Sequence, residues 1–498
     1  MVIVVVSSYL VFARGIERPL NHDEHQFLAP AAVLARHGAL PYRDFPLFHL
    51  PNLVFVYAAV ERLGFDLVLG AKLVSILATA SVIAMLAREA VRRPAFGHPG
   101  GSLLVTMGAL ALMIFDPVFC ATTGKTWNHE VPTALAFASL LLIGRASERD
   151  SLAASMLAGL TAGLAAGFRL TLAPVLAPLA LAAFLYPLPF RRQFIHGLVF
   201  GVCSVLALSP ALYFLSVDRE AFLFGNFEFP RLRLLDPTNE RIQKTMTWWR
   251  KLRYFGKEIV LLSWPLFLAF LAIAVPPAWV WLRRRERGHL KLGVLLLVLP
   301  FLLIGCFAPS RYQYQHFFVL IPFLALGVVY GLQSLAPIGR SARLYQGLFA
   351  GVSIFSILLG IKDYRNINAP WTMGDWHLTR ASTTGTDLRK YLKHGKILTL
   401  APTYPLLGGF DIYPEFATGP FAWRSAQLVP TDRRYRLHLI APDDLEGFLA
   451  SDPPVGILTG YEDDWDLEKP FLEYAKRHGY RLVHISKKRD LWISEKAR

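Results

Sequence analysis

Residues 17–52 read ERPLNHDEHQFLAPAAVLARHGALPYRDFPLFHLPN and begin directly after the first apolar run of the chain. They place two adjacent carboxylates, Asp23 and Glu24, between two histidines, close to a segment hydrophobic enough to enter a membrane. The residues after the acid pair form an amphipathic stretch too short to cross a bilayer and typical of a helix that lies in the membrane interface. A carboxylate partly removed from water favours its protonated form and can accept a proton. This stretch predicts a structured, chemically active loop on a membrane surface.

The composition is that of a polytopic membrane protein. The 498-residue chain is 54% hydrophobic and 18% charged, whereas ordinary soluble domains carry about 25% charged residues. Its mean hydropathy is +0.39. Apolar runs of membrane-spanning length recur through residues 1–361 and then stop. We therefore predict an all-α membrane domain over residues 1–361, including the loop 15–66, and a small soluble α/β domain over residues 362–498.

The apolar runs predict about eleven transmembrane helices. The run from Met1 is interpreted as a short first span rather than a cleaved signal peptide, because no basic residues precede it. The run at 152–187 is too long for one span at about 1.5 Å per residue, and a proline and an arginine interrupt it, so we expect two helices joined at Arg169. The predicted spans are 1–14, 67–88, 102–119, 131–146, 152–168, 170–187, 194–216, 258–282, 291–308, 315–335 and 344–361.

Basic residues in the short loops predict the orientation of these spans. In this arrangement five short loops on one side carry arginines, and that side is therefore expected to be cytoplasmic. The N-terminus is then cytoplasmic, whereas the acidic loop and the C-terminal domain lie outside a bacterial inner membrane. This pattern accounts for much of the net charge of +16, so nucleic acid is not a predicted partner. The loop arginines are Arg88, Arg92, Arg93, Arg145, Arg149, Arg191, Arg192, Arg283, Arg284, Arg285, Arg287, Arg340 and Arg343.

The C-terminal residues contain the alternating and amphipathic patterns of a small α/β domain. Four short segments rich in β-branched and aliphatic residues predict strands: KILTLAP (396–402), RLHLIA (436–441), VGILTG (455–460) and YRLVHIS (480–486). Two amphipathic segments that end in glycine predict helices, at 384–395 and 466–479. No nucleotide-binding glycine pattern is present.

A second polar group lies at the outer end of the predicted fourth span. The sequence TTGKTWNHEVP (122–132) supplies Lys125, His129 and Glu130. The same residues suit an ordinary helix start, with Asn128 as the cap and Glu130 in the first turn. One residue can serve both purposes, so a structural and a functional interpretation both stand here.

Two arginines on the same outer side suggest an anionic ligand. Arg169 and Arg311 lie in or beside predicted spans, where an arginine usually faces a cavity or an anion. Tyr312 follows Arg311, and Arg43 and Asp44 lie in the acidic loop. A guanidinium group suits a phosphate, and a carboxylate suits deprotonation of a hydroxyl. A substrate that carries a phosphate at the membrane surface, with a reactive group beside it, is a lipid-linked phosphosugar.

The ordered set of these features resembles the C-type (GT-C) membrane glycosyltransferases, a superfamily that includes the bacterial aminoarabinose transferase and the protein O-mannosyltransferases. The resemblance covers roughly residues 1–361. It rests on HDEHQFLAPAAVLARHGALPYRDF (22–45), NHEVPTALAFASLLL (128–142), GLTAGLAAGFRLTLAP (159–174) and SRYQYQHFFVLIPFLAL (310–326), in this order after the first span. It implies a GT-C-like fold and an inverting transfer of a hexose or pentose from a polyprenyl-phosphate donor.

The resemblance also implies roles for individual residues. Asp23 would be the base that deprotonates the acceptor, and Glu24 would support it. Glu130, with His129, matches a second acidic position, and Arg169 and Arg311 match positions near the donor phosphate. The further residues of the predicted substrate site are Lys125, Tyr312, Arg43 and Asp44.

The implied chemistry requires no general acid, because the lipid phosphate is already a good leaving group, and either arginine or a divalent cation would stabilise the charge on the phosphate. If a divalent cation such as Mg²⁺ or Mn²⁺ takes part, the candidate ligands are Asp23, Glu24 and Glu130. The expected partners are a polyprenyl-phosphate-linked sugar, membrane lipids, and a glycan, lipid or protein acceptor.

Three other functions fit the composition. A secondary transporter would explain the many spans, but only one interrupted segment is visible, where transporters often show a second copy. A polysaccharide polymerase or ligase would usually carry its large loop late in the chain. A membrane protein that binds glycans without catalysis would not need Asp23 for product formation.

Overall fold

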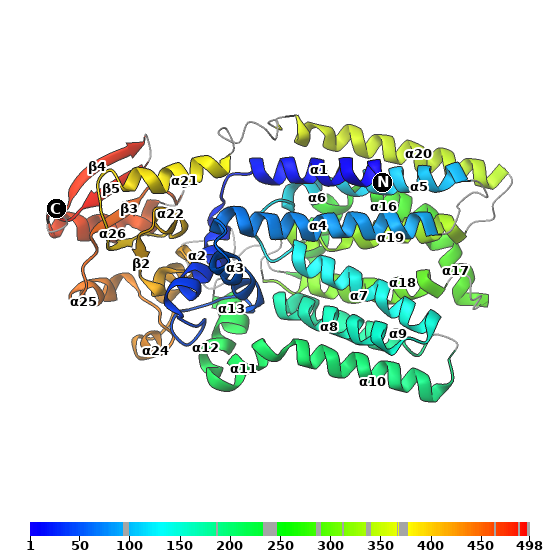
Figure 1. Cartoon of the computed structure of the whole chain (residues 1–498), viewed down its shortest axis with the longest axis horizontal. Coiled ribbons are helices and arrows are strands. Elements are labelled where there is room, and N and C mark those ends of the chain that lie inside the picture. Colours follow the sequence, from blue (N-terminus) through cyan, green and yellow to red (C-terminus); the bar gives the residue numbers. More distant parts are fainter. Residues whose placement is uncertain are drawn as a thin grey trace.

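The computed structural model describes residues 1–92, 99–185, 188–232, 247–284, 290–310, 313–334, 340–365, 367, 377–462, 465–486 and 489–495. Long helices lie side by side along the long axis of the molecule, and a small sheet with short helices lies at one end (Figure 1). We refer to residues 377–495 as the C-terminal unit. The chain is therefore mostly helical with a small sheet, as the hydropathy pattern predicts.

The helices of the N-terminal 365 residues account for the body of the molecule. They are α1 (Val2–Glu17), α2 (His22–His37), α3 (Asn52–Arg62), α4 (Leu67–Arg92), α5 (Pro99–Ile114), α6 (Pro117–Thr122), α7 (Glu130–Arg149), α8 (Leu152–Phe168), η2 (Leu170–Val175), α9 (Leu176–Ala182), α10 (Phe190–Ala207), α11 (Ser209–Val217), α12 (Arg219–Leu223), η3 (Phe224–Glu228), α13 (Phe229–Leu232), α15 (Trp248–Tyr254), η4 (Phe255–Val260), α16 (Trp264–Ala269), η5 (Phe270–Ala274), α17 (Val275–Arg284), α18 (Leu290–Phe307), η7 (Tyr314–Phe317), α19 (Leu320–Ser334), α20 (Arg340–Gly360) and η8 (Ile361–Tyr364).

Within the described residues, four helical segments are long and apolar enough to cross a membrane: 67–92, 290–307, 314–334 and 343–364. Two bent pairs raise the number to six if each pair is one span: 190–217, bent by 52°, and 248–280, bent by 93°. Further apolar helices are shorter. A multi-pass membrane protein follows from these segments, whereas the expected number of eleven spans stays a prediction.

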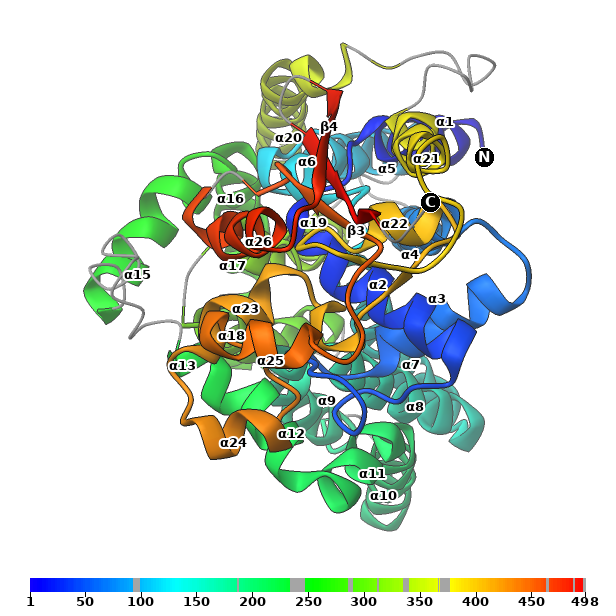
Figure 2. The ribbon, with the colours of Figure 1, turned by 90° about the vertical axis from the view of Figure 1, so that its left-hand side faces the viewer.

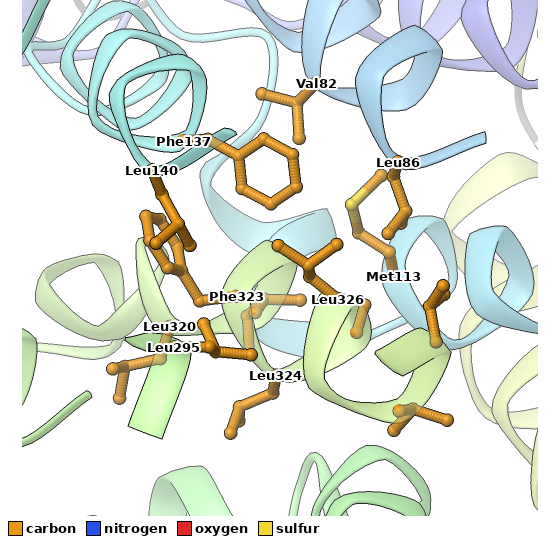
Figure 3. Packing of buried hydrophobic residues seen from close by; sticks show 14 of the residues in the cluster. Val82, Leu86, Met113, Phe137, Leu140, Leu295, Leu320, Phe323, Leu324 and Leu326 are labelled. Atoms are coloured by element: carbon orange, nitrogen blue, oxygen red, sulfur yellow. The ribbon is translucent and has the colours of Figure 1, made fainter. Parts of the chain in front are cut away.

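The core between the long helices is built from interlocking aliphatic and aromatic side chains. Val82 and Leu86 of α4, Phe137 of α7 and Phe323 of α19 meet there (Figure 3). The rings of Phe137 and Phe323 pack edge to face with their centres 5.4 Å apart, a preferred aromatic geometry. Such contacts hold helices that are far apart in sequence in one bundle.

Glycine allows α8 and α10 to pack backbone to backbone. A Cβ atom at Gly163 would lie 2.2 Å from the carbonyl oxygen of Ser204, and one at Gly159 would lie 2.3 Å from that of Phe200. Both distances are well below van der Waals contact. Small residues are used in this way where membrane helices approach closely.

The interruption expected at Arg169 is present. Helix α8 ends at Phe168, Arg169 has extended backbone angles, and a 3₁₀ turn and the short helix α9 follow. The break turns the Arg169 side chain inward, toward the ends of α7 and α19.

The C-terminal unit contains a five-stranded mixed sheet with the strand order β2-β1-β3-β5-β4. Strands β2, β1 and β3 are parallel, and β5 is antiparallel to both β3 and β4. The strands are β1 (Lys396–Leu398), β2 (Asp411–Ile412), β3 (Gly456–Thr459), β4 (Arg481–Ser486) and β5 (Arg489–Ile493). The helices are α21 (His377–Leu388), α22 (Thr403–Leu407), η10 (Pro414–Phe416), α23 (Pro420–Ala426), α24 (Thr431–Arg436), η11 (Pro442–Asp444), α25 (Leu445–Leu449) and α26 (Trp465–Arg477).

Three of the four strands predicted from sequence are confirmed, at 396–398, 456–459 and 481–486. The prediction of a strand at 436–441 is wrong. Helix α24 ends at Arg436, and His438 turns the chain with a positive φ of 54°. The apolar Leu437 and Leu439 are buried in a hydrophobic cluster formed by residues of both the N-terminal part of the chain and the C-terminal unit, so their alternation reflects a buried turn.

Helix α2 connects the C-terminal unit to the rest of the molecule. His25 Nδ1 and Thr403 Oγ1 are 2.7 Å apart, Arg36 donates to the carbonyl oxygen of Leu406 at 3.1 Å, and His37 lies 3.0 Å from Asp411. Figure 2 looks onto this end, with the C-terminal unit in front and the helical bundle behind it. One hydrophobic cluster includes residues from both sides of residue 361, and the domain boundary there stays a prediction.

Candidate active site

The two carboxylates at the start of α2 have different surroundings. Glu24 is fully buried, and its Oε1 accepts hydrogen bonds from the Thr126 backbone N–H at 2.7 Å and hydroxyl at 2.9 Å. Its Oε2 accepts from the Asn21 N–H at 2.7 Å, which completes a capping box with the Asn21 side chain. The Asp23 side chain is 25% exposed and forms an ion pair with His22 at 3.0 Å. Glu24 therefore holds the loop in place, and Asp23 is the more exposed of the two carboxylates.

A buried lysine and a buried glycine position the loop that carries Thr126. Lys72 Nζ donates to the carbonyl oxygens of Gly15 and Arg18 at 2.8 Å each and of Gly124 at 3.3 Å. Gly124 has a φ of 84°, and a Cβ there would lie 2.4 Å from the Gly15 Cα. The loop can therefore approach the end of α1 only because residue 124 is glycine.

The neighbouring residues add a cation and a further carboxylate. Lys125 is half-buried with its ammonium 3.8 Å from the centre of the Trp127 ring. Burial, followed by repulsion from Arg18, lowers the pKa of Lys125 to about 8. Glu130 begins α7 and accepts from the Gly124 N–H at 3.1 Å, and its buried Oε2 has no hydrogen-bond partner among the described residues.

Arg169 is held by three side chains from distant parts of the chain. Its Nε donates to Thr171 Oγ1 at 2.8 Å, its Nη2 to His316 Nδ1 at 2.9 Å, and its Nη1 to His129 Nδ1. Each histidine must be neutral to accept a hydrogen bond from Arg169. Burial, and after it the positive charge of Arg169, lowers the pKa of His129 well below its ordinary value. A small void, with room for about one water molecule, borders Arg169 and His316. We call Arg169, His129 and His316 the arginine cluster.

The start of α2 and the arginine cluster are joined through the loop that precedes α7. Glu24, next to Asp23, accepts two hydrogen bonds from Thr126, and His129 of the same loop accepts from Arg169. His49 contacts α2 through its Nε2, which lies 2.9 Å from Gln26 Oε1. The structure thus brings together predicted site residues from three separate sequence segments: Asp23 and Glu24, Lys125 to Glu130, and Arg169.

Other predicted site residues lie elsewhere or outside the described structure. Arg43 donates to Asp44 at 2.7 and 3.0 Å, and Asp44 also accepts from the Leu40 N–H at 2.7 Å. This hydrogen bonding, led by that from Arg43, lowers the pKa of Asp44. The pair stabilises an exposed turn, and its expected contact with substrate stays a prediction. Arg311 and Tyr312 lie outside the described residues.

The candidate metal ligands Asp23, Glu24 and Glu130 have different surroundings. Within the described ranges, no three His, Cys, Asp or Glu side chains are placed to hold one metal ion. Both oxygens of Glu24 already accept hydrogen bonds from N–H and O–H groups. Divalent-cation dependence of the reaction stays a prediction to be measured.

Two residues of this region were not predicted from sequence. Arg18 donates to the carbonyl oxygens of Ala121 and Cys120 and so holds the end of α6. Lys72, described above, is the only charged residue in the apolar run 67–87. That isolation was the available signal, since an ionisable residue within a span usually has a specific partner.

Comparison with known proteins places this geometry in a known fold. No protein-family model and no curated protein matches the sequence. Among solved structures, ArnT from Cupriavidus metallidurans bound to undecaprenyl phosphate is 14% identical, with a TM-score of 0.62 over 99% of this chain and 97% of that one. The apo form of the same protein gives a TM-score of 0.59 over the same shares, also at 14% identity. The oligosaccharyltransferase AglB from Archaeoglobus fulgidus, in complex with an inhibitory peptide and a dolichol-phosphate, is 10% identical, with a TM-score of 0.52 over 97% of this chain and 72% of that one.

These neighbours are membrane glycosyltransferases of the GT-C superfamily, and this chain has the GT-C fold. The resemblance noted in the sequence is thereby confirmed at the level of fold. The similarity to ArnT extends over nearly the full length of both chains, including the C-terminal unit.

Proposed function

We propose that this protein is an inverting glycosyltransferase that moves a sugar from a polyprenyl-phosphate donor to a cell-envelope acceptor on the outer side of the bacterial inner membrane. One observation carries the proposal: Asp23, a partly exposed carboxylate, adjoins Glu24, which is hydrogen-bonded to the loop that carries Lys125 and His129 of the arginine cluster. The GT-C fold supports it, and so do the lipid phosphates bound by two structural neighbours.

The proposed reaction needs one base and a cationic phosphate site. Asp23 takes the proton from an acceptor hydroxyl while that oxygen forms a bond to the anomeric carbon. The bond between the anomeric carbon and the phosphate oxygen breaks, and its electron pair leaves with the polyprenyl phosphate. Lys125 and Arg169 stabilise the negative charge on the phosphate oxygens. Attack from the face opposite the leaving group inverts the anomeric configuration.

The small void beside Arg169 marks the place proposed for the donor phosphate. It is lined by Thr133, Thr171 and His316 on its polar side and by Leu302 and Val319 on its apolar side. A polar end beside apolar helix faces suits a phosphate attached to a hydrocarbon chain. A hexose or a pentose fits the proposed mechanism equally, and the acceptor is a glycan, a lipid or a protein.

Mass spectrometry of envelope glycoconjugates tests this proposal. Deleting the gene should remove one sugar from an envelope component and accumulate the corresponding sugar-phosphate lipid. The wild-type gene should restore the product, and Asp23→Asn should not, although its protein level and melting temperature match the wild type. Unchanged glycoconjugates in the deletion strain, or full restoration by Asp23→Asn, would contradict the proposal.

A further inference from the structure

Two histidines flank the acid pair at the start of α2, and the C-terminal unit contacts both of them. The ring of His22 lies beside that of Phe421, with the ring centres 6.1 Å apart. His25 is 3% exposed. Its Nδ1 is 2.7 Å from Thr403 Oγ1, and its ring packs edge to face with that of Tyr404, with 5.5 Å between the centres. The C-terminal unit therefore holds the first turn of α2 through the residues that precede and follow the acid pair.

A tight turn brings α23 to this contact. Gly419, directly before α23, has a φ of 63°, in the left-handed region that favours glycine. A Cβ atom at this position would lie 2.8 Å from the carbonyl oxygen of Leu400, which is too close, and 3.6 Å from the Cβ of His25. Only glycine therefore lets the chain turn here against α2, and the turn sets Phe421 beside His22 two residues later.

The contact between His22 and Asp23 is unusual for neighbours on a helix. His22 Nε2 lies 3.0 Å from Asp23 Oδ1. Consecutive residues of an α-helix point about 100° apart, so their side chains do not normally face each other. The backbone N–H of Asp23 also donates to Asn21 Oδ1 at 2.9 Å. Both the backbone and the carboxylate of Asp23 are therefore held in one orientation.

A general base depends on such an orientation. Its carboxylate must direct an oxygen at the acceptor hydroxyl, and an error of about 1 Å in a reacting group can cost about a hundredfold in rate. An ionised carboxylate only accepts hydrogen bonds, so the contact requires a proton on His22 Nε2. His22 engages one oxygen of the Asp23 carboxylate and so fixes the direction of the other.

We propose that His22 is a positioning residue that orients the Asp23 carboxylate, and that the C-terminal unit contributes to the reaction by holding the first turn of α2 through Phe421 and Thr403. This inference rests on the proposed function, in which Asp23 is the base. His22 takes no proton from the acceptor and acts only through Asp23. The C-terminal unit thus influences the rate of the chemical step, in addition to any contact it makes with the acceptor.

The other end of α2 offers a matched control. His37 Nε2 lies 3.0 Å from Asp411 Oδ1 of the C-terminal unit, so a second histidine of the same helix contacts the same unit. His37 follows Asp23 by 14 residues, a helical rise of about 21 Å. A loss of docking would affect the variants of both histidines, whereas a loss of positioning would affect those of His22 alone.

Initial rates of sugar transfer test this inference. The purified full chain is added to detergent-solubilised membranes of the deletion strain, which supply the accumulated sugar-phosphate lipid and the unmodified acceptor. Mass spectrometry measures the product at several concentrations of the lipid. His22→Ala should lower kcat by about tenfold or more and leave the KM for the lipid nearly unchanged, because His22 does not contact the donor phosphate. His22→Gln keeps an N–H group near the position of Nε2 and should recover most of the lost rate.

Two further variants separate hydrogen bonding from packing. His22→Phe keeps a ring beside Phe421 but has no donor, so its kcat should fall even if His22→Ala is unstable. Thr403→Val removes the hydroxyl that contacts His25 with little change in shape, and it should lower kcat without raising the KM. His37→Ala should transfer sugar at the wild-type rate. Thermal unfolding of each variant shows that the folded protein is being compared.

The outcomes separate this inference from the proposed function. A wild-type protein that forms no product would contradict both. With an active wild type, the inference alone is overturned if His22→Ala and His22→Phe keep the wild-type kcat, or if His22→Gln is no faster than His22→Ala. It is also overturned if His37→Ala loses as much activity as the His22 variants do.

Discussion

At the scale of single residues, the first turn of α2 contains one carboxylate proposed for catalysis, Asp23, and one that stabilises the structure, Glu24. Glu24 accepts three hydrogen bonds in a fully buried position, and Asp23 stays partly exposed beside His22. The sequence predicts the pair as a unit with Glu24 in a supporting role. The structure indicates that this support consists of holding the loop that carries Lys125.

Glu24→Gln should therefore destabilise the protein. A glutamine places an N–H group where the Asn21 or Thr126 N–H already points, so at least one charge-assisted hydrogen bond is lost, which costs about 1.5–3 kcal/mol. Thermal unfolding in detergent measures the effect. Asp23→Asn and the exposed control Glu446→Gln should melt as the wild type does. A Glu24→Gln variant with wild-type stability would show that this interpretation is wrong.

The lowered pKa of Lys125 predicts that binding of the lipid-phosphate donor depends on pH. Because its folded pKa is lowered to about 8, the ammonium is charged below that pH and loses its charge as the pH rises through it. The KM for the lipid-phosphate donor should therefore increase above pH 8, with kcat less affected. Lys125→Arg should keep a low KM at higher pH, since arginine stays protonated.

The exposed Lys393→Arg serves as the control for this experiment and should leave the pH profile unchanged. If the donor KM of the wild type does not vary between pH 7 and 9, Lys125 does not contact the donor phosphate.

At the residue scale, the structure brings together several residues that were selected by their chemistry and expected membrane position, and their roles stay predictions. Asp23, Lys125, His129 and Arg169 were all selected because they combine a reactive side chain with the outer end of a span, and the structure places them in one region. Arg43 and Asp44 have the same chemistry, but adjacent opposite charges in a turn pair with each other. Sequence position alone does not distinguish these two cases.

At the scale of elements, the break after α8 presents the arginine cluster. If α8 continued through residue 169, the backbone hydrogen bonds of the helix would be satisfied. The Arg169 guanidinium would then lie within the bundle, in a position from which it could not reach both histidines. The break could be predicted, since Gly167, Arg169 and Pro174 all disfavour an apolar helix there. The partners could not, because His129 and His316 lie 40 and 147 residues away in the chain.

Arg169→Lys should reduce glycosyl transfer by about a hundredfold, because a single ammonium cannot reproduce the planar contacts to two histidines and a phosphate. The initial rate with a saturating acceptor measures this. The control Arg192→Lys changes an exposed arginine that pairs with Asp150 and should not alter the rate. Full activity of Arg169→Lys would place the phosphate site elsewhere.

The wrong strand at 436–441 shows a limit of periodicity at the same scale. Alternating apolar residues indicate one buried face, but they do not say what buries it. Here Leu437 and Leu439 are buried in a cluster that includes residues from both ends of the chain, which no local pattern reveals.

At the scale of the whole molecule, the C-terminal unit is docked onto the end that carries the candidate active site. Hydropathy alone predicts where the membrane-spanning part stops. It does not predict the docking, which depends on contacts such as His25 with Thr403, 378 residues apart. A second contact region joins Arg433 of α24 to Glu228 at 2.6 and 2.7 Å and to Glu220 at 2.8 Å.

Arg433→Ala should loosen this docking without unfolding the protein. The pKa values of Glu220 and Glu228 are lowered by their hydrogen bonds to Arg433 and, for Glu220, to Arg436. The contribution to stability is therefore present at neutral pH and is lost only as the pH falls through the folded pKa values. Hydrogen exchange should become faster in α24 and α12 of the variant at pH 7. Exchange that matches the wild type would mean that α2 alone holds the unit.

The central claim is that a lipid phosphate binds next to Asp23, between Lys125 and the arginine cluster. Cryo-electron microscopy of the full chain with undecaprenyl phosphate tests it most directly. The account predicts density for the phosphate in contact with Lys125 and Arg169, with the Asp23 carboxylate facing it. Phosphate density bound elsewhere, with Asp23 and Arg169 both remote from it, would contradict the account.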